Sequence, residues 1–366
     1  MRPFTYNGFA SRVIFGSGTI TQLEAETQRL CVSRALVIST PRQKDMAEAA
    51  AALLGDRVAG MFTGATMHTP VDVTEQAIGE LRRCRADGIV AIGGGSTTGL
   101  GKAIALRTDL PQLVIPTTYA GSEMTAILGQ TEAGRKTTLK DPKVQPETII
   151  YDVELTLKLP PQVSGVSGMN AIAHAVEALY APDGNPVIDL MAEDGIRALA
   201  RSLPAIVQTP DNPQARSDAL YGAWLCGICL GSVSMALHHK LCHTLGGMFN
   251  LPHADMHAVL LPYAMRYNAL AAPHAAAKVA AALGVDDAAI GLQALARAAG
   301  APRSLRDLGM PEHGIESATE VAASNPYANP APVTPEGIRK LLAQAWAGDD
   351  IQGNGENLPF SEHMKS

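Results

Sequence analysis

Short apolar runs alternate with amphipathic segments through the first half of the chain. Residues 35–38, 88–92 and 113–115 are apolar runs of strand length, and segments with helical periodicity, 43–54 and 99–107, follow the first two. An apolar run without polar alternation indicates a strand buried on both faces, which is typical of a parallel sheet covered by helices. The pattern therefore predicts an α/β domain in which ligands bind at the carboxyl ends of the strands.

The pattern changes near Pro160 and Pro161, where long alanine-rich and leucine-rich segments begin. No strand-like alternation interrupts them, so we predict an α/β domain over residues 1–158 and an all-α domain over 159–366. The polar segment 349–366 is expected to pack loosely. The predicted helical segments are 168–180, 186–202, 215–249, 254–271, 275–283 and 288–299.

Composition narrows the class of protein. A chain of 366 residues favours two domains, and 46% hydrophobic with 17% charged residues is typical of a globular protein. The net charge is −6 and no basic stripe is present, which argues against nucleic-acid and anionic-membrane partners. The amino terminus lacks the apolar core of a signal peptide, and no window approaches the roughly 20 apolar residues of a membrane span. We therefore expect a cytoplasmic protein.

The five cysteines are an odd number in a large chain, which favours reduced thiols over a disulfide framework. Cys226 and Cys229 form a CxxC pair, but no second pair completes a zinc site. We predict that both are small buried residues of a helix. The remaining cysteines are Cys31, Cys84 and Cys242.

Two polar loops follow predicted strands. The glycine-rich segment 93–99 follows the second strand and begins a helix, where backbone N–H groups and the helix amino end favour phosphate. The segment 116–123 follows the third strand and contributes hydroxyls at Thr117, Thr118 and Ser122. Two such loops side by side suit a dinucleotide, although a tight structural turn also explains the glycines.

Histidines gather in an apolar segment of the second half. His239, His243 and His253 lie there, and upstream Asn170 and His174 are spaced i and i+4, on one helix face. Buried imidazoles require partners, so such a group indicates a metal site or proton-transfer chemistry. Asn170 stands at the position where a fourth metal ligand is expected, and its side chain is an amide.

These motifs resemble the iron-containing alcohol dehydrogenase superfamily over nearly the whole chain. Within it, segments 93–106, 168–180 and 238–247 resemble the maleylacetate reductases. The resemblance implies a Rossmann-like dinucleotide-binding α/β domain and an all-α domain, the dehydroquinate synthase-like architecture, with the active site between them. It also implies reduction of the carbon–carbon double bond of maleylacetate to give 3-oxoadipate, in the breakdown of aromatic compounds.

The resemblance carries over the metal site as Asn170, His174, His239 and His253. Metal-using members have aspartate at the first position. Three neutral imidazoles and one neutral amide leave a divalent cation uncompensated, so we predict that no metal is bound.

Without a metal, the histidines are expected to act directly. His243 is the expected proton donor, and His174, His239 and His253 are expected to polarise the substrate or anchor its carboxylates. Lys240 could pair with a carboxylate of the dianionic substrate or be a solvated surface lysine. His238 is expected to be a core residue.

The resemblance also implies the cofactor contacts. Thr40 stands where relatives often have an aspartate, so NADPH is expected to be accepted as well as NADH. Tyr119 and Tyr327 either line the substrate pocket or belong to the core. The expected cofactor-binding residues are Ser39, Thr40, Gly93, Gly94, Gly95, Ser96, Thr117, Thr118, Ser122, Thr125, Lys136, Leu155 and Thr156.

Two other functions use the same scaffold. A metal-dependent alcohol or aldehyde dehydrogenase requires bound iron or zinc, against which Asn170 argues. A dehydroquinate synthase-like lyase, or a cofactor-binding protein without turnover, forms the third possibility. The expected partners are a small dicarboxylate substrate and a second copy of the chain in a homodimer.

Overall fold

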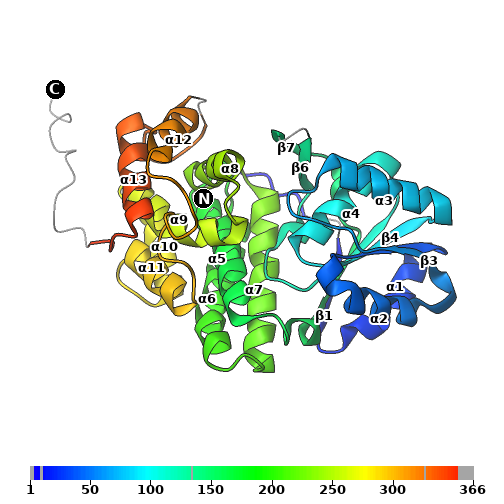
Figure 1. Ribbon diagram of the computed structural model, residues 1–366. Helices are drawn as coiled ribbons and strands as arrows, with labels where there is room; N and C mark the ends of the chain where they lie inside the picture. The colour runs from blue at the N-terminus through cyan, green and yellow to red at the C-terminus, as the bar shows by residue number, and fades with distance from the viewer. Residues whose placement is uncertain (1–3, 9–10, 133–134, 325–326, 353–366) are drawn as a thin grey trace.

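The chain folds into an α/β part followed by a helical part (Figure 1). The computed structural model describes residues 4–8, 11–132, 135–324 and 327–352. Six parallel strands form one sheet in the order β1-β8-β5-β4-β2-β3. They are β1 (Arg12–Gly16), β2 (Ala35–Ile38), β3 (Val58–Phe62), β4 (Gly88–Gly93), β5 (Gln112–Pro116) and β8 (Thr148–Asp152).

The three predicted strands are confirmed as β2, β4 and β5, three of the four fully buried strands of the sheet; the fourth, β8, was not predicted. The strands β1 and β3 were not predicted because they are edge strands of mixed burial, and β3 contains Gly60. A separate antiparallel hairpin, β6 (Ile127–Glu132) with β7 (Arg135–Lys140), was also not predicted.

Helices cover both faces of the sheet, as the apolar strands predict. Val90 and Ile92 of β4 pack toward α1 (Leu23–Arg29) and α2 (Lys44–Leu54). The alternate residues Ile89 and Ala91 pack toward α3 (Val71–Cys84) and α4 (Gly95–Thr108). Burial on both faces explains why these strands show no polar alternation.

The order of the strands reverses between β2 and β4. From β2 the chain passes outward to β3, returns to β4 beside β2, and then continues in the other direction to β5. In open parallel sheets ligands bind at such a switch point, at the carboxyl ends of the strands. Those ends here are the segment after β2 and the glycine loop after β4.

After β8 the described residues form helices and connecting loops. The predicted helical half is confirmed, although α5 begins at Pro161 instead of residue 168, because proline is well accommodated in a first helical turn. Cys226 and Cys229 are buried in α7 as predicted, and neither forms a disulfide. The helices are α5 (Pro161–Ala178), α6 (Pro186–Gln208), α7 (Pro213–Ser232), α8 (Leu237–Phe249), α9 (His253–Asn268), α10 (Pro273–Leu283), α11 (Ala288–Ala298), α12 (Gly314–Ala323) and α13 (Pro335–Ala347).

The prediction of one continuous helix over 215–249 is wrong. The chain bends by 93° between α7 and α8. Val233 is extended, and the backbone N–H groups of Ala236 and His238 donate to the side chain of Glu177. Helical hydrogen bonding therefore stops and begins again, which places the start of α8 against α5.

Among the described residues, Pro273–Ala298 is apolar and long enough to cross a membrane by length and composition, although the sequence predicted no such segment. The helices α7 and α8 would form a second segment of this kind only if they were counted as one across their bend. Half of the most apolar window in Pro273–Ala298 is buried inside the structure, as in core helices. Of the polar end segment, residues 353–366 lie outside the described residues.

Candidate active site

The glycine loop after β4 opens the amino end of α4. Gly93 has a φ of 153°, and a Cβ on Gly94 would lie 2.9 Å from Thr118 Cγ2, so both positions require glycine. Gly95 is exposed with open space around its Cβ position, and Ser96 is half-buried beside it. The free N–H groups of this first turn are thus accessible to an anion.

Gln43 ties the carboxyl ends of β2 and β5 together below this loop. The Thr40 hydroxyl donates to Gln43 Oε1 at 3.0 Å, and Gln43 Nε2 donates to Thr117 Oγ1 at 2.7 Å. Ser39 is fully buried and its hydroxyl donates to the Thr40 carbonyl. Sequence reasoning missed Gln43, because nothing in the sequence shows that two loops 74 residues apart meet.

Lys102 holds the second loop from below. Its side chain is buried, and Nζ donates to the carbonyl oxygens of Ser122, Thr125 and Ile127 and to Thr125 Oγ1, at 2.6 to 3.0 Å. Burial lowers the pKa of Lys102 to about 7, and the nearby Glu123 opposes that shift. Ser122 and Thr125, two of the residues expected to contact a cofactor, are therefore fixed through Lys102, which was not identified from the sequence.

The segment after β8 does not present both of its expected cofactor contacts. Thr156 is fully buried, and its hydroxyl donates to the Val153 carbonyl at 2.8 Å, so the expectation of a cofactor contact at Thr156 is corrected. Leu155 is half-buried and packs against the core on the α1 and α2 side of the sheet. Lys136 pairs with Thr131 in the hairpin, but its side chain lies outside the described residues.

Three helices bring six histidines together. The rings of His174 and His239 stack with centroids 5.2 Å apart, and those of His253 and His257 are 4.4 Å apart. His243 is exposed and His253 half-buried, whereas the others are buried, so the cluster extends from the interior to the surface. His174 lies on α5; His238, His239 and His243 lie on α8; His253 and His257 lie on α9.

Glu177 anchors this cluster and was not identified from the sequence. Its fully buried carboxylate lies 2.7 Å from His239 Nδ1 and accepts the backbone N–H groups of Ala236 and His238 at 2.8 Å. Burial by itself raises the pKa of Glu177, but the hydrogen bond and charge of His239, the charge of His238 and the Ala236 N–H together lower it to about 2. The signal available in the sequence was a glutamate three residues after His174 in an alanine-rich helix.

Behind His239, a pair of histidines joins α8 to α9. His238 Nε2 lies 2.9 Å from His257 Nδ1, and Cys242 Sγ lies 3.7 Å from His238 Nε2. Burial, together with the charge of His239, lowers the pKa of His238 to about 3. The prediction that His238 is a core residue is confirmed.

The four residues that the resemblance assigns to a metal site are three histidines and one asparagine, none of which brings the negative charge of a carboxylate. Asn170 Oδ1, His174 Nδ1 and His239 Nε2 are buried and have no hydrogen-bond partner. Within the described part of the chain, however, the group whose ligand atoms all lie within 4.8 Å of one another is His238, Cys242 and His257, which hydrogen-bond among themselves. The amide of Asn170 brings no charge. We therefore derive no step through a metal.

Lys240 lies beside the histidines and is half-buried. Its Nζ is 5.7 Å from the centroid of the Tyr327 ring, and the Tyr327 hydroxyl is buried without a hydrogen-bond partner. Tyr119, by contrast, is a core residue, because it is fully buried and its hydroxyl accepts from Arg216 Nη1 at 3.2 Å.

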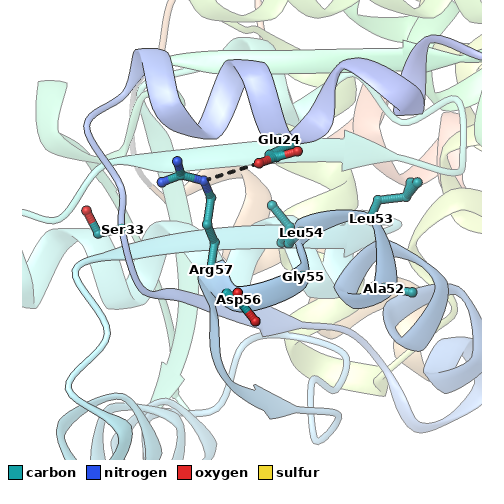
Figure 2. Close-up of a pocket in the computed structure, with 8 residues that line it drawn as sticks. All are labelled: Glu24, Ser33, Ala52, Leu53, Leu54, Gly55, Asp56 and Arg57. Carbon is teal, nitrogen blue, oxygen red and sulfur yellow. Dashed lines mark ion pairs between the residues drawn. The ribbon is translucent and has the colours of Figure 1, made fainter.

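A hollow in the α/β part lies away from these groups (Figure 2). It is lined by residues of α1, the end of α2 and the turn before β3, and Arg57 pairs with Glu24 across it at 3.7 Å. Ser33 precedes β2 and Arg57 precedes β3, so this hollow lies at the amino ends of the strands. It is thus at the opposite edge of the sheet from the glycine loop.

The fold and the histidine-bearing helices define the class of protein. Residues 10–153 match the model of the iron-containing alcohol dehydrogenases, and residues 165–346 match that of the C-terminal part of the Fe-containing alcohol dehydrogenase family. The chain belongs to the iron-containing alcohol dehydrogenase family, and the resemblance inferred from its motifs is confirmed. It is accordingly an oxidoreductase.

Within this family the chain is similar to maleylacetate reductases. It is 55% identical to the maleylacetate reductase of Rhizobium sp. strain MTP-10005, over 95% of this chain and 99% of that one. The crystal structure of maleylacetate reductase from Agrobacterium tumefaciens superposes with a TM-score of 0.93 at 53% identity, covering 96% of this chain and all of that chain. An iron-containing alcohol dehydrogenase from Corynebacterium glutamicum follows with a TM-score of 0.91 at 44% identity, covering 96% and 98% of the two chains.

Proposed function

We propose that this protein reduces the carbon–carbon double bond of maleylacetate to give 3-oxoadipate, with NADH or NADPH as the reductant, in the breakdown of aromatic compounds. The observation that carries the proposal is the set of buried polar atoms without partners on Asn170, His174 and His239. These atoms are uncharged, so they lack the negative charge that a resident cation requires, and neutral His174 can present an N–H to the oxygen of a carbonyl substrate. The likeness to maleylacetate reductases supports the choice of substrate.

The reaction needs two groups from the protein. A dinucleotide held at the glycine loop would supply a hydride to the alkene carbon β to the ketone, and the alkene electron pair would move to the ketone oxygen as an enolate. A hydrogen-bond donor must stabilise that oxygen, and a proton must then reach the carbon α to the ketone. Burial lowers the pKa of His174 well below its ordinary value, so His174 is neutral and retains one N–H with which to donate.

We assign His243 as the proton donor. It is the exposed member of the cluster, and its ring centroid lies 6.4 Å from that of His239. His253 and His239, on either side of His257, complete the polar wall around the substrate. Replacing His243 with alanine should lower turnover far more than cofactor affinity, measured by steady-state kinetics and by nucleotide titration; an unchanged rate removes His243 from the mechanism.

The substrate carries two carboxylates, and Lys240 is the cation we assign to one of them. The ring of Tyr327 holds its ammonium near the histidines through a cation–π contact. The unpartnered Tyr327 hydroxyl can donate to the same carboxylate, because burial raises the pKa of Tyr327 and keeps it protonated.

The dinucleotide is proposed to lie across the switch point of the sheet. Its diphosphate would meet the N–H groups at Gly94, Gly95 and Ser96, and its adenosine ribose would lie near Thr40. Thr118 and Ser122 on the neighbouring loop complete this surface, and buried Thr125 supports it from below through Lys102. We further propose a homodimer located in the cytoplasm, with no nucleic-acid or membrane partner.

One assay separates this function from its alternatives. Oxidation of NADH is followed with maleylacetate and with simple aldehydes, each with and without a chelator. We expect turnover of maleylacetate that the chelator does not change. Aldehyde reduction that is lost with the chelator, together with no turnover of maleylacetate, would establish the metal-dependent alcohol dehydrogenase instead. No net oxidation with either substrate would favour a lyase or a binding protein.

A further inference from the structure

We propose that Glu177 is a positioning residue that fixes the tautomer of His239, so that His239 Nε2 is left to face the substrate. The inference rests on the proposed function for its effect on turnover. The tautomer itself is a property of the protein alone.

The contacts of Glu177 determine which nitrogen of His239 carries the proton. Glu177 Oε2 lies 2.7 Å from His239 Nδ1 and also accepts the N–H of Ala236, while Oε1 accepts the N–H of His238 at 2.8 Å. Because both Glu177 oxygens accept backbone N–H groups, the side chain is held as an acceptor, so the short contact places a proton on His239 Nδ1. In neutral His239 the lone pair is then on Nε2.

That second nitrogen forms no hydrogen bond with the described residues. His239 Nε2 is buried without a hydrogen-bond partner, and so is the nearby His174 Nδ1. The rings of these two histidines are stacked 5.2 Å apart. A buried nitrogen without a partner carries a desolvation cost of about 1–3 kcal/mol, which an incoming proton would relieve.

The same carboxylate also positions the helix that carries His239. Ala236 is the residue before α8, and His238 is the second residue of that helix. Alanine has no polar side chain with which to cap a helix, so Glu177 accepts these backbone N–H groups in its place. Glu177 belongs to α5, which also carries Asn170 and His174. One residue therefore fixes both the orientation of α8 against α5 and the chemical form of His239.

The first experiment measures the tautomer directly. Protein labelled with ¹⁵N-histidine is observed by NMR at pH 8 without substrate, and the His239 signals are assigned by their loss in His239→Asn. We expect a proton on Nδ1 of His239. A bare Nδ1 would overturn the proposal, whatever the substrate of the enzyme proves to be.

The second experiment measures the consequence for turnover. In Glu177→Gln the side chain cannot accept from all four donors, which include the Tyr180 hydroxyl, and an amide N–H₂ placed opposite His239 would force its proton onto Nε2. We expect kcat with maleylacetate to fall roughly a hundredfold, as when a histidine loses its orienting carboxylate, with little change in the KM for the dinucleotide.

A matched variant separates this effect from loss of a helix cap. The side chain of Asn212 caps α7, the helix before α8, by accepting the N–H groups of Gln214 and Ala215. Asn212→Ala should lower stability by about 1 kcal/mol and leave kcat unchanged. If Glu177→Gln and Asn212→Ala lower kcat equally, Glu177 has only a structural role. If the wild type turns over no maleylacetate, the proposed function fails while the NMR result still decides the tautomer.

Discussion

His238 and His257 share one hydrogen bond, with Nε2 of the first 2.9 Å from Nδ1 of the second. Both rings are fully buried, and the remaining ring nitrogens, His238 Nδ1 and His257 Nε2, have no hydrogen-bond partner. Burial lowers the pKa of both, to about 3 for His238 and well below the ordinary value for His257. The pair is therefore neutral in the folded protein near pH 7.

The stability of the folded protein should fall on acidification, because the folded state keeps both histidines neutral. Below about pH 6.5, the ordinary histidine pKa, the unfolded chain binds protons that the folded chain does not, so the free energy of unfolding decreases. The loss continues until the pH passes the folded pKa, about 3 for His238. Each buried histidine contributes up to about 1.4 kcal/mol per pH unit. Urea unfolding between pH 7 and pH 5 measures the slope.

A surface histidine provides the control for this slope. His274→Asn removes an exposed histidine at the start of α10 and should leave the pH dependence unchanged. Glu177 contributes a loss of the same sign, but only as the pH falls from 4.5 toward its pKa of about 2, so it does not interfere. A flat stability between pH 7 and pH 5 would contradict the assignment of neutral buried histidines.

Asn170 should determine whether the histidine site takes a metal. Asn170→Asp adds the negative charge that a divalent cation requires beside neutral imidazoles, so we expect it to retain Fe²⁺ or Zn²⁺ after reconstitution and dialysis. Metal content is measured by inductively coupled plasma mass spectrometry, with Asn170→Ala as the variant that offers neither charge nor ligand. Equal metal content in the wild type and in Asn170→Asp would show that charge at residue 170 does not decide binding.

Three of the four buried strands could be predicted from the sequence, whereas the fourth, β8, and the two edge strands were missed. Strands β2, β4 and β5 are apolar throughout because helices cover both their faces. The edge strand β3 is half-buried along its whole length and gives no such signal. The break between α7 and α8 was missed because its cause, Glu177, lies more than fifty residues upstream. The hydrophobic pattern of a segment indicates how that segment is buried, but it does not reveal a hydrogen bond to a residue more than fifty positions away.

The same limit applies to the site. His174, His239 and the glycine loop were found because their residue types are unusual where they stand. Gln43 and Lys102 were missed because their importance comes from partners distant in sequence, Thr117 for the first and the loop at Ser122 for the second. Thr156 was wrongly expected at the cofactor because its position after β8 does not reveal that its hydroxyl turns inward.

Lys102 should contribute to both stability and cofactor binding. Lys102→Met removes the four hydrogen bonds that Lys102 Nζ donates; the Ser122 carbonyl keeps its bonds from Thr125, whereas the carbonyls of Thr125 and Ile127 lose this donor. Unpaired buried acceptors should lower the free energy of unfolding by about 3 kcal/mol. The freed loop should also raise the KM for the dinucleotide more than that for maleylacetate. Urea unfolding and steady-state kinetics measure the two effects.

A lysine on the surface of the same part of the molecule serves as the comparison. Lys44 pairs with Glu48 across one turn of α2, and both side chains are more than half exposed. Lys44→Met should therefore cost less than about 1 kcal/mol and change neither KM. If Lys102→Met is as mild as Lys44→Met, the four contacts of Lys102 Nζ do not hold the loop.

Thr40 should set the preference between the two dinucleotides. It follows β2 at the switch point, and its hydroxyl donates to Gln43 Oε1 at 3.0 Å without adding charge. A carboxylate here would accept the 2′-hydroxyl of NADH but repel the 2′-phosphate of NADPH, so Thr40→Asp should raise the ratio of kcat/KM for NADH over NADPH at least about tenfold, or 1.4 kcal/mol. Thr40→Ser keeps the hydroxyl and should keep the wild-type ratio. An unchanged ratio in Thr40→Asp would place the adenosine ribose elsewhere, because a charge within contact distance of a phosphate cannot be neutral in its effect.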